Sequence, residues 1–157
     1  MIARRLHFAV RLAAFILVVL ACACARQQPV GRFDPARDAA KDVADAVALA
    51  KAENKRVIVD VGGEWCSWCH TMDRFIAANE DLKSLIDSRY VWVKVNYSKE
   101  NKNEALLSQW PRIEGYPHLF VLDRDGKLLH SQDTSQLEAG TSYDKTKFVS
   151  FAENWAG

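Results

Sequence analysis

Cysteine is scarce in this chain, and its placement leaves one pair for the folded part. The sequence of 157 residues contains 4 cysteines. Cys22 and Cys24 lie in or beside an apolar N-terminal stretch, so Cys66 and Cys69 are the only pair in the remaining sequence. A single pair cannot form the disulfide framework that holds many small exported domains together. The fold must therefore depend on a hydrophobic core, which a hydrophobic content of 49% can supply.

The chain also lacks a dominant charge of either sign. Its formal net charge is +1, from 21 Lys and Arg against 20 Asp and Glu. No basic face with interleaved aromatic side chains is present, which is the pattern of many nucleic-acid-binding surfaces. We therefore expect no nucleic-acid partner. The hydrophobic content likewise excludes an intrinsically disordered chain, and no internal repeat is present.

Only one long apolar run occurs, and it lies near the N-terminus. Leu12–Leu20 follows a cluster of arginines and precedes small residues. This arrangement is typical of a targeting leader, and the run is too short to span a bilayer comfortably as a mature helix. The expected organisation is a leader at 1–25, a tether at 26–33 and a folded domain at 34–157.

The end of the leader allows more than one kind of processing. Val19-Leu20-Ala21-Cys22 resembles a bacterial lipobox, in which Cys22 becomes the lipid-modified first residue. Ala21-Cys22-Ala23 and Ala23-Cys24-Ala25 are alternative small-x-small cleavage sites, and an uncleaved anchor is a further alternative. We expect lipid attachment at Cys22 and a bacterial periplasmic protein tethered to the membrane.

Apolar spacing and capping residues predict the secondary structure. Asp34-Pro35 is a favourable helix start, and apolar residues at three- and four-residue spacing continue this helix to about Glu53. Residues 131–142 are polar and are expected to be irregular. The other expected elements are strand 56–61, helix 66–78, helix 81–88, strand 90–95, helix 104–109, strand 119–122, strand 127–130 and a helix capped by Asp144. This order predicts an α/β fold with a central mixed sheet flanked by helices.

The motif Cys66-Ser67-Trp68-Cys69 lies between an expected strand and an expected helix. In that setting a Cys-x-x-Cys pair indicates a redox-active dithiol. The helix N-terminus favours a thiolate at Cys66, and Cys69 lies one helical turn later, close enough to form a disulfide with it. Gly62-Gly63, just before the motif, is interpreted as a sharp turn.

A wider set of motifs resembles the thioredoxin superfamily over about residues 36–157. These motifs are Val59-Asp60-Val61, the dithiol motif with Trp65, Lys94-Val95-Asn96, Gly115-Tyr116-Pro117 and Phe120 to Gly126. The likeness is to periplasmic thioredoxin-like oxidoreductases, including the C-terminal domain of the transmembrane disulfide reductase. It implies a thioredoxin fold with an extra N-terminal helix. Cys66 would attack a partner disulfide, and Cys69 would resolve the mixed disulfide.

The resemblance also implies a pair of charged residues beside the dithiol. Asp60 matches a buried acid that helps to deprotonate the resolving cysteine, and Lys94 matches the lysine that pairs with it. A carboxylate in an apolar strand is costly unless it is paired or protonated. The alternative is that Asp60 faces a polar strand edge and Lys94 faces solvent.

A substrate-binding surface is expected around the dithiol. Pro117 matches the cis-proline of the superfamily, which directs the backbone of Tyr116 toward a partner chain. The bulk of Tyr116 could narrow the groove in which that chain would lie. The expected substrate-binding residues are Trp65, Trp68, Tyr116 and Pro117. For Trp65 and Trp68 the alternative is that they pack in the hydrophobic core.

Cofactor binding is the main competing interpretation of the motif. Cys66 to His70 also matches the c-type haem attachment pattern, and two cysteines with a histidine could hold zinc or copper. A haem would need a second axial ligand. Met72 is too close in sequence, and His118 and His130 have no supporting pattern. We therefore expect no cofactor and no metal.

Reduction of disulfides in exported client proteins is the function that these patterns favour. Asp60, Lys94 and Trp65 resemble the reducing branch of the superfamily, and the electrons would come from a membrane-embedded thiol donor. A non-catalytic module that binds clients or metal is one alternative. A disulfide oxidase or isomerase is another.

Overall fold

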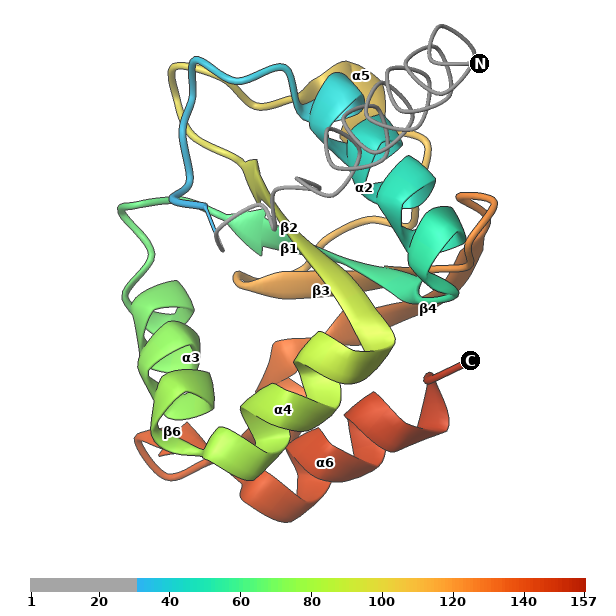
Figure 1. Cartoon of the computed structure of the whole chain (residues 1–157). Coiled ribbons are helices and arrows are strands. Elements are labelled where there is room, and N and C mark those ends of the chain that lie inside the picture. The colour runs from blue at the N-terminus through green and yellow to red at the C-terminus, as the bar shows by residue number, and fades with distance from the viewer. Residues whose placement is uncertain (1–30) are drawn as a thin grey trace, which may run out of the picture.

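A four-stranded mixed sheet forms the centre of this computed structural model, which describes residues 31–157 (Figure 1). The strands are ordered β2-β1-β3-β4. β1 runs parallel to β2 and antiparallel to β3, and β4 is antiparallel to β3. Their bounds are β1 (Arg56–Gly62), β2 (Tyr90–Asn96), β3 (His118–Leu122) and β4 (Leu128–Asp133).

Helices cover both faces of the sheet. On one side lies α2 (Ala39–Glu53), and on the other lie α3 (Ser67–Ala78), α4 (Glu80–Arg89) and α6 (Lys145–Asn154) (Figure 1). The parallel strands β1 and β2 require a crossover, which α3 and α4 provide. A short helix, α5 (Glu104–Leu107), lies between β2 and β3 in the sequence.

The central strand β1 separates two hydrophobic cores. Successive side chains of a strand point to opposite faces. Val57, Val59 and Val61 accordingly pack with the buried face of α2, whereas Ile58 packs with residues of α3, α4 and α6. The strand is thus buried on both faces, as its continuous apolar sequence predicts.

The first helix starts later than the sequence predicts. Asp38, not Asp34, is its N-cap and accepts a hydrogen bond from the Lys41 backbone N–H at 3.0 Å. Asp34 instead accepts from the Ala36 N–H at 2.8 Å and closes a turn. Both aspartates are good capping residues, but only Asp38 directly precedes the buried stripe that begins at Ala39.

The polar segment 131–142 is more regular than predicted. It contains the end of β4, the 3₁₀ helix η1 (Thr134–Leu137) and a hairpin of β5 (Glu138–Ala139) and β6 (Ser142–Tyr143). Asp133 caps η1, and the Thr134 hydroxyl donates to the Pro117 carbonyl at 2.5 Å. Polar side chains therefore order this segment by satisfying nearby backbone groups.

The α/β architecture predicted from the sequence is confirmed, with its extra N-terminal helix and mixed sheet. The predicted leader, its candidate lipid site at Cys22 and residues 26–30 of the predicted tether lie outside the described residues. Among residues 31–157, no helix is both long and apolar enough to cross a membrane.

Candidate active site

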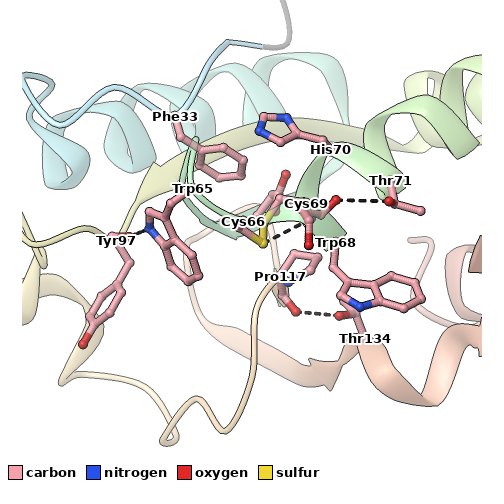
Figure 2. The surroundings of a disulfide bond; sticks show 12 residues. Phe33, Trp65, Cys66, Trp68, Cys69, His70, Thr71, Tyr97, Pro117 and Thr134 are labelled. Atoms are coloured by element: carbon pink, nitrogen blue, oxygen red, sulfur yellow. Dashed lines mark hydrogen bonds between the residues drawn. A yellow bond between two sulfur atoms is a disulfide. The ribbon is translucent and has the colours of Figure 1, made fainter. Parts of the chain in front are cut away.

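The two cysteines lie where β1 leads into α3. Cys66 is the N-cap of α3, and its Sγ accepts a hydrogen bond from the Cys69 backbone N–H at 3.1 Å. The two residues form a disulfide with a Cα–Cα distance of 5.3 Å (Figure 2). Cys66 is 4% exposed and Cys69 is fully buried. The N-terminus of α3 is therefore placed to stabilise negative charge on Cys66 after reduction.

Gly62 allows the strand to approach the disulfide closely. A Cβ atom at this position would lie 2.4 Å from Cys69 Sγ, which leaves no room for a side chain. At Gly63, a Cβ would lie 2.3 Å from the indole nitrogen of Trp65. The predicted turn begins at Gly63, whose carbonyl accepts a hydrogen bond from the Cys66 N–H at 2.9 Å, but neither glycine has a positive φ. Lack of space, and not backbone conformation, requires glycine at both positions.

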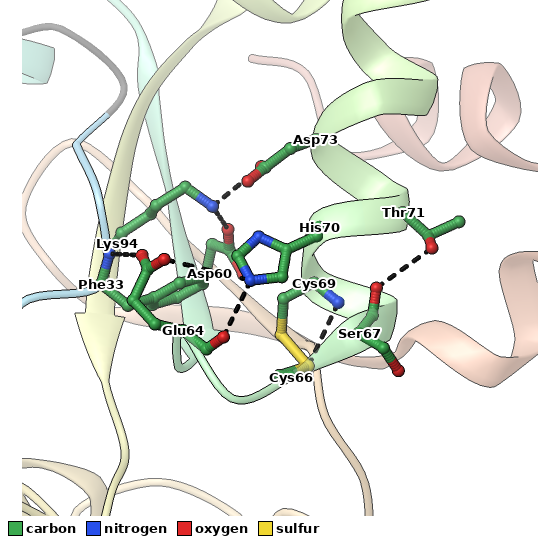
Figure 3. A network of polar contacts seen from close by, with 10 residues as sticks. All are labelled: Phe33, Asp60, Glu64, Cys66, Ser67, Cys69, His70, Thr71, Asp73 and Lys94. Carbon is green, nitrogen blue, oxygen red and sulfur yellow. Dashed lines mark hydrogen bonds and ion pairs between the residues drawn. A yellow bond between two sulfur atoms is a disulfide. The ribbon is translucent and has the colours of Figure 1, made fainter.

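Asp60 and Lys94 form a buried ion pair beneath the site. They are opposite one another in the parallel register of β1 and β2, with Lys94 Nζ 2.8 Å from Asp60 Oδ2 (Figure 3). Lys94 Nζ also lies 2.8 Å from Oδ1 of Asp73 in α3, and the indole N–H of Trp92 donates to Asp60 at 3.3 Å. Because residues two apart on a strand share a face, Asp60 lies on the same side of β1 as Gly62 and Cys69.

This environment shifts the pKa values of both charged partners. Burial raises the pKa of Asp60, and the opposing effect of Lys94 only partly offsets it. Burial alone would lower the pKa of Lys94. The charge and hydrogen bonds of Asp60 and Asp73 outweigh that effect and raise it. Asp60 Oδ1 is buried without a hydrogen-bond partner among residues 31–157, and can thus bind a proton.

Pro117 faces the disulfide from the opposite wall of the site (Figure 2). The Tyr116–Pro117 peptide bond is cis, as the resemblance implied. Tyr116 stacks on Tyr97 at 4.9 Å between ring centroids and makes an edge contact with Trp65 at 5.6 Å. Burial raises the pKa of Tyr116 to about 12, so its phenol is neutral at physiological pH.

The two tryptophans occupy different environments. Trp65 is 58% exposed, and its indole N–H donates to the Tyr97 carbonyl at 2.7 Å. Trp68 packs against the cysteines and against the core, where it makes an edge contact with Tyr143 at 5.5 Å. Trp65 is therefore available at the surface beside the site, whereas Trp68 is largely a packing residue.

Sequence reasoning missed Phe33 and Asp73. The sequence could have placed Asp73 near the site, because residue i+4 of a helix shares a face with residue i and Asp73 is four residues after Cys69. No sequence pattern could have placed Phe33 there, because it is a single aromatic residue in a polar stretch. In the structure it forms a buried cluster with Cys66 and Cys69, although it falls in the segment assigned to the tether.

The histidines considered as metal or haem ligands have separate surroundings. His70 bonds through Nε2 to the Glu64 carbonyl at 2.9 Å. His118 is buried and bonds to the Ser131 hydroxyl at 2.8 Å, and burial lowers its pKa. His130 stacks on Trp155 at 4.2 Å between centroids. Within residues 31–157, no cluster of three or more His, Cys, Asp or Glu side chains is arranged to hold a metal ion.

A Cys-x-x-Cys disulfide at a strand–helix junction, opposite a cis-proline, is the arrangement that the thioredoxin-like resemblance implied. A thioredoxin-like family model matches residues 38–124, and the chain belongs to that family. Over 92 residues the chain is 27% identical to the thiol:disulfide interchange protein DsbD of Colwellia psychrerythraea, covering 58% of this chain and 15% of that protein. Over 52 residues it is 36% identical to human spermatogenesis-associated protein 20, covering 33% and 7% respectively. The chain thus spans a small fraction of both relatives.

Solved structures show the same fold. The disulphide isomerase from Xylella fastidiosa superposes with a TM-score of 0.67 at 23% identity, covering 78% of this chain and 94% of that one. The oxidised C-terminal domain of Neisseria meningitidis DsbD gives a TM-score of 0.59 at 20% identity, covering 80% and 99%. These likenesses confirm the thioredoxin fold.

The raised pKa of Asp60 predicts a specific dependence of stability on pH. A raised pKa means that the folded state binds this proton more tightly than the unfolded state, so Asp60 lowers stability as pH rises from about 4 through the raised value. Asp60→Asn, which resembles the protonated acid, should be as stable as wild type near pH 4 and more stable at pH 7. Urea unfolding of both oxidised proteins at the two pH values measures this. If the free energy of unfolding of wild type instead rises relative to that of Asp60→Asn as pH rises, the pKa of Asp60 is lowered in the folded protein.

Proposed function

We propose that this protein is a thiol–disulfide oxidoreductase that reduces disulfides in exported proteins. The observation that carries this proposal is the Cys66–Cys69 disulfide at the N-terminus of α3, packed against the face of β1 that also carries the buried carboxylate of Asp60. A disulfide with a structural role only would not need the charged network of Asp60, Lys94 and Asp73 beneath it. Burying that network is costly, and such groups are common where proton transfer is required.

The first chemical step uses Cys66 in the reduced protein. Its thiolate attacks one sulfur of the client disulfide, the client S–S bond breaks, and a Cys66–client disulfide forms. The second client sulfur leaves as a thiolate and takes up a proton. Cys66 is suited to this role because its sulfur lies at the positive end of the α3 dipole.

The second step uses Cys69 and Asp60. Cys69 is fully buried, and burial disfavours its thiolate. Asp60 accepts the Cys69 proton, and its raised pKa makes it a more effective base than an exposed aspartate near neutral pH. Cys69 then attacks Sγ of Cys66, the bond between Cys66 and the client breaks, and the client leaves as its second thiol. The client gains two electrons, and the protein is left with the Cys66–Cys69 disulfide.

The surface around the dithiol is suited to an extended client segment. The Tyr116 backbone precedes β3 and makes no backbone hydrogen bond within residues 31–157, so it can pair with a client strand. Trp65 adds an exposed apolar surface on the same side, in contact with Tyr116. We assign client binding to Trp65, Tyr116 and Pro117, with Trp68 supporting the site from within.

A complete cycle needs a reductant for the Cys66–Cys69 disulfide. The likeness to a thiol:disulfide interchange protein supports a membrane thiol donor, and a periplasmic location would place the protein beside it. A lipid anchor at Cys22 followed by the tether at 26–33 would hold the domain near that donor. This arrangement requires export of the domain at 34–157 and cleavage of the leader at 1–25.

The proposed activity predicts catalysis of insulin reduction by dithiothreitol. Wild type should accelerate insulin precipitation, and Cys66→Ser should abolish the acceleration. Cys69→Ser, reduced first and then mixed with insulin after removal of dithiothreitol, should accumulate a mixed disulfide between Cys66 and insulin, visible by non-reducing electrophoresis and mass spectrometry. A binding module would neither accelerate precipitation nor trap insulin. Trapping at Cys69 in the Cys66→Ser protein, equal to that at Cys66, would reverse the assigned roles.

The proposed anchor predicts the chemistry of the mature N-terminus. In a bacterial host, the membrane-bound protein should begin at Cys22 and carry acyl chains, and Cys22→Ala should release it or leave its leader uncleaved. Intact-protein mass spectrometry with peptide mapping measures this. A mature protein that begins at Cys24, Arg26 or later, without lipid, would contradict the anchor and leave the site chemistry unaffected.

A further inference from the structure

Phe33 is buried although it lies in an irregular segment before α2. Its exposure is 3%, and its ring forms one buried apolar cluster with Cys66 and Cys69, bordered by Trp68 and Tyr116. Figure 2 shows the ring beside the disulfide, on the side away from Pro117. The ring carbon Cζ lies 3.0 Å from the Cβ position of Gly62. Phe33 thus packs beside the disulfide, in one cluster with both cysteines.

The same ring covers the buried cation of the site. Lys94 Nζ lies 4.1 Å from the centroid of the Phe33 ring, a distance at which the ring face attracts a cation. The ring therefore contacts both the dithiol cluster and Lys94.

Two hydrogen bonds with side chains of the domain reach this segment, one from the Phe33 N–H and one from Asn101 Nδ2 to the Pro35 carbonyl at 2.9 Å. The Phe33 N–H donates to Glu64 Oε1 at 3.0 Å (Figure 3), and residues 31–38 contain no helix or strand. A cavity of about 550 Å³ borders Phe33, Trp65 and Tyr97, which gives the ring space to move into. Segments with few backbone hydrogen bonds open at low free-energy cost, without global unfolding.

These observations conflict with unassisted attack on the disulfide. A thiolate must reach a sulfur atom to exchange, yet Cys66 is 4% exposed and Cys69 is fully buried with Phe33 in place. We infer that Phe33 is a removable cap that determines which thiols and disulfides reach Cys66 and Cys69. This inference rests on the proposed exchange activity. Protein partners displace the ring as they bind, whereas small thiols must wait for it to open.

Glutathione is a suitable small probe, because its exchange with the protein is fully defined. A glutathione thiolate attacks Cys66 Sγ, the Cys66–Cys69 bond breaks, and Cys69 leaves as a thiolate that takes up a proton. A second glutathione thiolate attacks the mixed disulfide and releases reduced Cys66 and oxidised glutathione. If only the open state reacts, both this rate and that of the reverse reaction scale with the open fraction.

The test compares three variants with wild type. Phe33→Ala removes the ring, Glu64→Ala removes its hydrogen-bond acceptor, and Phe33→Leu is the matched control that keeps apolar cover. Stopped-flow measurements follow reduction by glutathione and reoxidation by oxidised glutathione. In Phe33→Ala both rates should rise by about tenfold at an unchanged equilibrium constant, with a smaller rise in Glu64→Ala and little change in Phe33→Leu. Insulin reduction should change less than either glutathione rate.

Unchanged glutathione rates in both alanine variants would overturn the cap. A shift in the equilibrium constant of the glutathione exchange, with only the reduction or the reoxidation rate changed, would also overturn it. The ring would then change the relative stability of the oxidised and reduced protein and not the access to the sulfur atoms. Thermal unfolding in both redox states establishes that the variants are folded. If Phe33→Ala does not fold, Glu64→Ala still tests the cap. Wild type that exchanges with glutathione but leaves insulin intact would contradict the proposed function and not the cap.

Discussion

The buried pair of Asp60 and Lys94 is the interaction on which the site depends. A charge with no exposed surface is tolerable only when it is paired, and the parallel register of β1 and β2 provides that pairing by setting these two residues opposite one another. The sheet therefore cannot shift its register here without losing the pair, and the position of the dithiol above it is fixed as a consequence.

The remaining parts of the site converge on this pair from separate elements. The β1–α3 junction places Cys69 against Gly62, on the same face of the strand as Asp60, and α3 then brings Asp73 to the other side of Lys94. From the N-terminal segment, Phe33 contacts both the dithiol cluster and Lys94. Pro117, directly before β3, forms the opposite wall. The dense packing around the buried carboxylate thus accounts for the low exposure of Cys66 and Cys69, for the raised pKa of Asp60 and for the restricted access to the sulfur atoms.

Local sequence patterns predicted much of the fold and the position of the dithiol between a strand and a helix. The pairing of Asp60 with Lys94 was implied by the resemblance to the thioredoxin superfamily, and the structure places these two residues together. One error arose where two similar local signals compete. Asp34 and Asp38 are equally good caps, and only tertiary burial of the stripe from Ala39 decides between them.

Other features depend on contacts between distant residues and have no local signal. The segment 131–142 is polar, yet it is ordered by Thr134 bonding to Pro117, a partner that no periodicity reveals. Phe33 acquires its position from residues more than thirty positions away in the sequence. The close approach of Gly62 to Cys69 also had no local signal, because a sequence shows the conformational freedom of glycine more readily than its lack of volume.

The most direct test of this account is the rate at which Cys69 resolves a mixed disulfide with and without Asp60. Stopped-flow exchange with a model disulfide, run across pH, separates the first attack by Cys66 from resolution by Cys69. The account predicts that Asp60→Asn slows resolution at pH 7, leaves the first attack largely unchanged, and loses its defect as pH rises and Cys69 ionises unaided. Resolution by Asp60→Asn at the wild-type rate at pH 7 would show that Asp60 is not the base.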